Sequence, residues 1–168
     1  MKNISSNDLK SILAAHKTWI DSKYKEGKRA DLRNADLEGA DLKGANLVQA
    51  NLSGANLVGA NLSGANLCAA SLEGANFAYA NLSHANLYAA FLEDATLSGA
   101  NLRNADLRGA NLSGANLVNA DLEGAIVTGT ILEEKEKVDL RAKFDEFAKS
   151  LGVEIVSLMV KRTETINL

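Results

Sequence analysis

The chain has 168 residues, 46% of them apolar and 23% charged, with a formal net charge of −3 at pH 7. This size and composition predict one soluble globular domain, and the slight acidic excess excludes a polycation built to bind nucleic acid or anionic lipid. No apolar run is long enough for a membrane helix, and the polar first residues do not resemble a secretory signal. The single cysteine, Cys68, excludes an intrachain disulfide, so we expect a cytoplasmic protein.

The first predicted element is an amphipathic helix over residues 6–25. Ser5 followed by Asp8 is typical of a capping box, and Gly27 is expected to end the helix. The histidine on the apolar face has no evident catalytic partner, so we interpret His16 as a packed cap residue. The apolar side chains at helical spacing are Leu9, Ile12, Leu13, His16, Ile20 and Tyr24, with Trp19 beside them.

A five-residue repeat fills the middle of the chain. From Ala30 to Ala120 every fifth residue is alanine, nineteen in succession, and two positions later comes leucine, replaced once by Phe77. Asn or Asp stands between them in sixteen of the nineteen repeats. The exceptions are Ser71, Phe91 and Thr96, and a weaker continuation runs to Leu132.

A period of five fits neither a helix with one buried stripe nor one long strand. Successive leucines would step by roughly 140° around a helix and would alternate between the faces of a strand. A three-residue extended segment, however, points alanine and leucine the same way, and the next two residues can turn the chain. Eleven of the thirteen glycines occupy the second position after the leucine, where a type II turn needs positive φ. Each repeat is therefore predicted to be a short strand plus a corner.

The unit Ala-(Asn/Asp)-Leu-X-X resembles the pentapeptide-repeat family, as in Ala60-Asn61-Leu62-Ser63-Gly64. The resemblance covers residues 30–132 and implies a mainly β fold, a right-handed quadrilateral parallel β-helix with four repeats per coil. That implies about five coils here and a body roughly 25 Å long at the usual strand spacing. We expect the leucines and alanines to fill the interior and leave no lumen.

The tail is predicted to form a helix over residues 134–150 and a strand over 153–160. The chain thus divides into an N-terminal helical cap (1–29), the repeats (30–132) and a C-terminal helix and strand (133–168). The tail is a second cap or an oligomerisation element, because its strand can pair with the last coil or with a second copy in a homodimer.

No group of residues predicts catalysis, a metal site or a cofactor site. Two histidines and one cysteine cannot form a structural zinc site. Cys68 and His84 are expected on different coils and faces, which argues against a nucleophile–base pair. A filled interior also lacks the concave pocket that active sites use, so we predict a non-enzymatic protein.

Six outward residues of the middle coils depart from the repeat and form the candidate interaction surface: Tyr79, His84, Tyr88, Phe91, Glu93 and Asp94. Tyr79 and His84 replace corner glycines, and Phe91 replaces an Asn or Asp. Tyr88 and Phe91 straddle one corner, which predicts a contact patch. The alternative is that these are surface aromatics without a function.

One side of the predicted solenoid collects carboxylates, namely Asp31, Glu73, Glu93, Asp94 and Glu133. Family members that confer quinolone resistance resemble B-form DNA and bind topoisomerase in its place. A net charge of −6 over residues 30–132 is sparse beside duplex DNA, with about one charge per 1.7 Å, which favours a solubilising role. We therefore predict a scaffold for an unidentified protein partner, without direct nucleic-acid or membrane binding. A DNA-mimicking modulator of a type II topoisomerase is the alternative.

Overall fold

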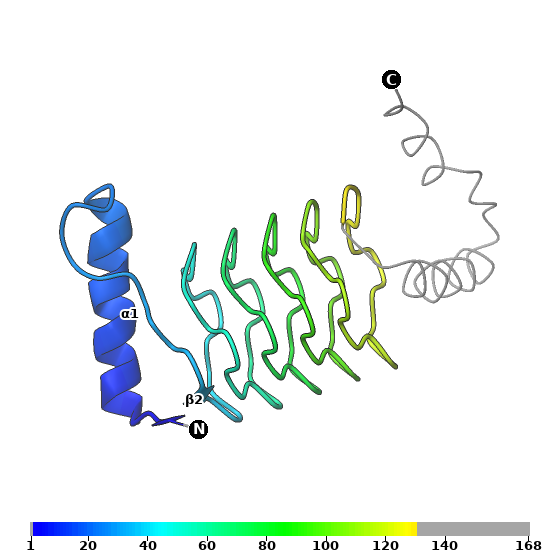
Figure 1. Cartoon of the computed structure of the whole chain (residues 1–168), viewed down its shortest axis with the longest axis horizontal. Helices are drawn as coiled ribbons and strands as arrows, with labels where there is room; N and C mark the ends of the chain where they lie inside the picture. The colour runs from blue at the N-terminus through cyan, green and yellow to red at the C-terminus, as the bar shows by residue number, and fades with distance from the viewer. Residues whose placement is uncertain (1, 131–168) are drawn as a thin grey trace.

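The computed structural model describes residues 2–130, which form a solenoid with one helix at its N-terminal end (Figure 1). The elements are β1 (Lys2–Asn3), α1 (Ser6–Asp21) and β2 (Ala35–Asp36), and β1 pairs in parallel with β2. The helix and strand predicted for the tail lie outside the described residues. Among residues 2–130, no helix has the length and apolar content needed to cross a bilayer.

Successive coils pair through parallel bridges between residues 20 positions apart, as between Asn51 and Ser71. The leucine N–H donates to the next coil, from Leu52 to the Ser71 carbonyl at 2.8 Å, while Asn51 donates back to the Ala30 carbonyl at 3.0 Å. A 20-residue spacing places four five-residue repeats in each turn. The described part of the chain is therefore a parallel solenoid, as the resemblance to the pentapeptide-repeat family implied (Figure 1).

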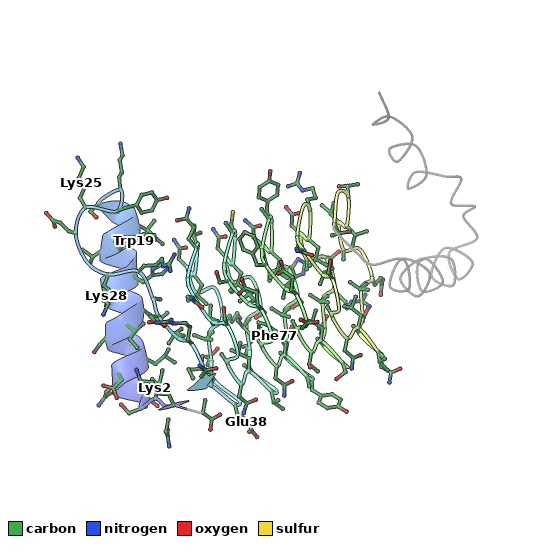
Figure 2. The ribbon with its side chains drawn as sticks, viewed as in Figure 1. Lys2, Trp19, Lys25, Lys28, Glu38 and Phe77 are labelled. Carbon is green, nitrogen blue, oxygen red and sulfur yellow. The ribbon has the colours of Figure 1, made fainter. Side chains whose placement is uncertain are left out.

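The alanine and leucine of each repeat form one continuous core. The leucines of a column such as Leu52, Leu72 and Leu92 are completely buried. Phe77 replaces a leucine in the next column and is also completely buried, near the middle of the body (Figure 2). Side chains thus fill the interior of the described coils.

Each corner is closed by a hydrogen bond from the alanine N–H to the preceding leucine carbonyl, as between Ala55 and Leu52 at 3.0 Å. The residue before the alanine has a positive φ, as predicted for the glycines; Gly54, for example, has a φ of 67°. Nine corners adopt the same conformation without glycine, including Tyr79 at 58°. The corner is therefore imposed by the coil ladder, and glycine only removes its conformational cost.

The Asn or Asp of the repeat satisfies a backbone group that the ladder leaves without a partner. Its side-chain oxygen accepts a hydrogen bond from the N–H two residues later, as Asn86 Oδ1 does from Tyr88 at 3.0 Å. All sixteen repeats that carry Asn or Asp form this bond. The polar residue therefore stabilises the strand-to-corner transition in every coil.

Helix α1 begins as predicted. The Ser5 hydroxyl accepts from the Asp8 N–H at 3.1 Å and donates to the Asp8 carboxylate at 2.6 Å, so Ser5 is the N-cap of α1. Leu9, Ile12 and Leu13 of α1 pack against the core of the first coil. The helix covers apolar surface that the first coil would otherwise expose.

The helix ends four residues earlier than the predicted range 6–25. It stops at Asp21 because Lys23 and Tyr24 adopt positive φ, 56° and 71°. The Ser22 hydroxyl then accepts from the N–H groups of Lys25 and Glu26. The predicted stop at Gly27 was wrong, and Tyr24 is exposed rather than packed on the apolar face.

Candidate interaction surface

The solenoid distributes the six predicted surface residues over different sides and corners. Tyr88 and Phe91 flank the corner at Ala89, and Glu93 and Asp94 follow Phe91 on the same side. We call the set Tyr88, Phe91, Glu93 and Asp94 the corner surface. Tyr79 and His84 lie at the two preceding corners of the coil, so they are not part of this surface. The six-residue surface is thus split by the structure, and its binding role stays a prediction.

Phe91 breaks the structural rule of the repeat. Its backbone bridges Ser71 and Asn111 like any other strand residue, but its ring is 45% exposed. Because phenylalanine offers no acceptor, the Glu93 N–H has no hydrogen-bond partner within residues 2–130. A residue that costs a hydrogen bond and leaves an aromatic side chain exposed is typical of a functional position.

Tyr88 is held in place by an ion pair on the next coil. The Arg108 guanidinium lies 5.8 Å from the centre of the Tyr88 ring. It also donates to both oxygens of Asp106, at 2.8 and 2.6 Å. These hydrogen bonds lower the pKa of Asp106. The Tyr88 ring is thus half exposed, and it contacts the Arg108 cation, which is itself held by Asp106.

The carboxylates near Phe91 have no cationic partner in the described part of the chain. Glu93 Oε1 accepts from Asn111 Nδ2 at 2.5 Å, and Glu73 Oε2 accepts from Ser53 Oγ at 2.7 Å. Glu93 Oε2 is buried without a hydrogen-bond partner. Together with the exposed Asp94, these groups form a cluster of three uncompensated negative charges.

Asp31 differs from the other carboxylates of its side. Its carboxylate accepts two hydrogen bonds from the Arg33 guanidinium, at 2.8 and 2.7 Å, and these are the main cause that lowers the pKa of Asp31 to about 2. Its charge is therefore neutralised locally. Glu133, the fifth carboxylate predicted for this side, lies outside the described residues.

Tyr79 and His84 each stand alone at their corners. The Tyr79 ring is 74% exposed and lies over Gly99 of the next coil. His84 is exposed, with a φ of 57°, and it lies on a different side from Cys68. The geometry therefore does not bring the thiol and this imidazole together.

Within residues 2–130, no group of His, Cys, Asp and Glu side chains could hold a metal ion. One shallow, open hollow is lined by Lys2, Asp31, Arg33 and Asn34, where the Asp31–Arg33 pair is already formed.

Coils of 20 residues with a filled core define the class of protein: a parallel β-solenoid that presents its variable side chains on the outside. The chain belongs to the pentapeptide-repeat family. The family model for pentapeptide repeats matches 8 copies over residues 30–68, 55–94 and 90–129. No significant match was found among the curated proteins.

Three solved structures illustrate the similarity. A pentapeptide repeat protein from the Arabidopsis thaliana thylakoid lumen is 33% identical, with 65% of this chain and 76% of that one covered and a TM-score of 0.40. A pentapeptide repeat protein from Nostoc PCC 7120 is 29% identical, with 73% and 96% covered and a TM-score of 0.41. The plasmid-mediated fluoroquinolone resistance protein QnrB1 is 21% identical, with 81% and 75% covered and a TM-score of 0.35.

Proposed function

We propose that this protein is a non-enzymatic interaction scaffold whose corner surface binds a protein partner. Phe91 carries the proposal, because its exposed side chain replaces the Asn or Asp that would accept from the Glu93 N–H. The chain gives up a hydrogen bond at this position, although the residue that replaces the acceptor stays 45% exposed. Tyr88, fixed by Arg108 across the adjacent corner, supplies a second aromatic anchor.

The solenoid supports such a surface physically. The inter-coil ladder holds the backbone of Phe91 through its N–H to Ala70 and its carbonyl to Leu72, at 3.0 and 2.8 Å. A rigid surface loses little conformational entropy when it binds. Exposed Tyr and Phe side chains are typical anchors at protein interfaces, and carboxylates beside them select the charge of the partner.

Affinity purification from the native cell tests the proposal. The double variant Tyr88→Ala with Phe91→Ala should lose the partner that the wild-type chain captures, measured by quantitative mass spectrometry. Tyr79→Ala is the matched control, because it removes an exposed aromatic ring outside the corner surface. Equal capture of every protein by the wild type and the double variant would refute the scaffold role of this surface.

A second candidate function is DNA-mimicking modulation of a type II topoisomerase. The carboxylates Glu73, Glu93 and Asp94, which form no ion pair within residues 2–130, favour this function. Other carboxylates, however, are neutralised by ion pairs with Arg33, Arg103 and Arg108. The remaining charge is sparse beside duplex DNA. A supercoiling assay with purified protein separates the two functions. Unchanged supercoiling activity of the topoisomerase at micromolar concentrations of this protein would contradict the DNA-mimic function.

Two finer features belong to the same proposal. The family resemblance favours a right-handed coil with a quadrilateral section and caps at both ends. Cys68, the single cysteine, favours a reducing compartment such as the cytoplasm.

A further inference from the structure

The contact of α1 with the first coil includes one completely buried imidazole. His16 is the single residue of α1 that is buried in the docked helix. Its Nδ1 accepts a hydrogen bond from the Ala30 N–H at 3.1 Å, and Ala30 begins the first repeat, directly after the loop of residues 22–29. This hydrogen bond therefore joins the helix to the point at which the chain enters the solenoid.

The imidazole fits this position only as the neutral ring. Because Nδ1 accepts a hydrogen bond, the proton of the neutral ring lies on Nε2, which has no hydrogen-bond partner within residues 2–130. A second proton would go to Nδ1 and would break the bond to Ala30. Burial lowers the pKa of His16 more than the Val48 carbonyl of the first coil raises it, since a buried cation without a partner is costly.

The charged groups of the described residues around the imidazole do not stabilise its protonated form. Arg29, in the loop, repels a proton there and lowers the pKa of the imidazole further. In the first coil, Asp31 is paired with Arg33, whose hydrogen bonds are the main cause that lowers the pKa of Asp31 to about 2. On α1 itself, the Asp21 carboxylate is paired with Lys17. Both carboxylates are thus already paired, so protonation leaves an uncompensated charge on the ring.

Helix α1 and the loop of residues 22–29 form one packed unit, which we call the cap unit. Trp19 stacks on the imidazole with 5.5 Å between ring centres, and the Tyr24 ring lies against Trp19 at 4.5 Å. The Lys28 N–H closes the loop onto the Ala15 carbonyl at 3.1 Å. Figure 2 shows Trp19 in the part of the helix nearer to this loop. These contacts lie inside the cap unit, so they do not have to break when the unit leaves the first coil.

We propose that protonation of His16 releases the cap unit from the first coil, while the coils themselves stay folded. The ladder between coils does not involve the imidazole, since it joins strand to strand, as from Leu52 N–H to the Ser71 carbonyl at 2.8 Å. Leu9 and Leu13, which pack against the core of the first coil, leave with the helix. Acid therefore uncovers the apolar end of the solenoid, and neutral pH covers it again. This conformational change belongs to the N-terminal end and does not depend on the corner surface.

Hydrogen exchange of the full-length chain near pH 7.5 and pH 5.5 tests the release. The released imidazole binds its proton with the ordinary pKa of 6.5, and the docked imidazole binds it more weakly. The opening equilibrium of α1 should therefore rise as the pH falls below 6.5, by at most about tenfold per pH unit. The protection factors of the α1 amides, corrected for the effect of pH on chemical exchange, should fall in proportion. The amides of residues 51–110 should keep their protection.

Fluorescence of Trp19, the single tryptophan of the chain, reports the same release. Its emission should shift to longer wavelength near pH 5.5, because the ring loses the cover of the first coil. His16→Asn does not titrate, so both pH responses should disappear, whether asparagine holds the cap unit docked or leaves it released. His84→Asn is the matched control, because it removes an exposed histidine outside the cap unit, and it should respond like the wild type.

The proposal is overturned if the α1 amides of the wild type are equally protected near pH 7.5 and pH 5.5. It is also overturned if the coils lose protection together with α1, since the protein then unfolds as a whole, or if His16→Asn keeps the wild-type response. A loss of protection that is confined to the cap unit and abolished by His16→Asn supports the release. Partner capture through Tyr88 and Phe91 tests the proposed function separately.

Discussion

The imidazole of His16 accepts a hydrogen bond through Nδ1 from the Ala30 N–H at 3.1 Å, where α1 meets the first coil. His16 is completely buried and stacks on Trp19 with 5.5 Å between ring centres. Burial lowers the pKa of His16, and Arg29 lowers it further, while the Val48 carbonyl opposes the shift. Nε2 nevertheless has no hydrogen-bond partner. The neutral imidazole is the form that fits, because a protonated Nδ1 would face the Ala30 N–H with a second donor.

We predict that the free energy of unfolding falls as the pH drops below 6.5, the ordinary pKa of histidine. The lowered pKa of His16 means that the unfolded chain binds the proton more strongly, so acid favours unfolding until the folded pKa is passed. Urea unfolding near pH 7.5 and pH 5.5 measures this difference. His16→Asn keeps an acceptor oxygen without a titrating group and should reduce the difference.

His84→Asn provides the control for this pH dependence. His84 is exposed, with a φ of 57°, and asparagine tolerates this conformation. The variant should therefore unfold with the same pH dependence as the wild type. If the pH dependence survived in His16→Asn but disappeared in His84→Asn, it could not be assigned to His16.

Phe91→Asn should stabilise the fold and weaken partner binding at the same time. An asparagine here restores the acceptor for the Glu93 N–H, which adds about 0.5–1.5 kcal/mol for one hydrogen bond. Urea unfolding measures the gain, and affinity capture measures the loss of the aromatic anchor. Thr96→Asn makes the same repair on the next side and should stabilise without changing capture. Unchanged or lower stability in both variants would show that the repeat asparagine is not the stabilising element.

Gly99→Ala should destabilise more than Gly59→Ala. Both glycines have positive φ, 65° and 63°, but a Cβ at Gly99 would lie 2.7 Å from the Tyr79 ring, whereas one at Gly59 meets nothing within 4 Å. Gly59→Ala should cost about 1 kcal/mol for the left-handed conformation alone. Adding Tyr79→Ala to Gly99→Ala should remove the additional loss of stability relative to Gly59→Ala. Equal costs for the two glycines would mean that the exposed ring simply moves aside.

Phe77→Ala should cost about 3–5 kcal/mol, the usual range for a buried phenylalanine. The Phe77 side chain is completely buried between the leucines of neighbouring coils, so truncation leaves a cavity that the ladder cannot close. Tyr79→Ala, in the same repeat, should stay within about 0.5 kcal/mol because the ring is on the surface. Comparable costs at the two positions in thermal unfolding would contradict the filled-core arrangement.

The period of five by itself determined the strand-plus-corner unit of this protein, its inward alanines and leucines, and the positive φ of the corner glycines, while the resemblance to the family supplied the coil of four repeats. These features follow from contacts within one repeat, and each of the nineteen repeats carries the same pattern of residues. The backbone role of the Asn and Asp residues is equally local, yet it emerged only once the hydrogen bonds of Asn86 and its equivalents were visible.

Tertiary structure decided the features that join residues distant in the chain. The helix ends at Asp21 because the loop after it folds back, bringing Lys28 N–H to the Ala15 carbonyl at 3.1 Å. Coil stacking places Arg108 against Tyr88 and separates Tyr79 from Phe91, although all lie within thirty residues. Their neighbours are set by the 20-residue coil, and contacts between coils depend on side-chain shape and charge that a faithful five-residue repeat does not encode.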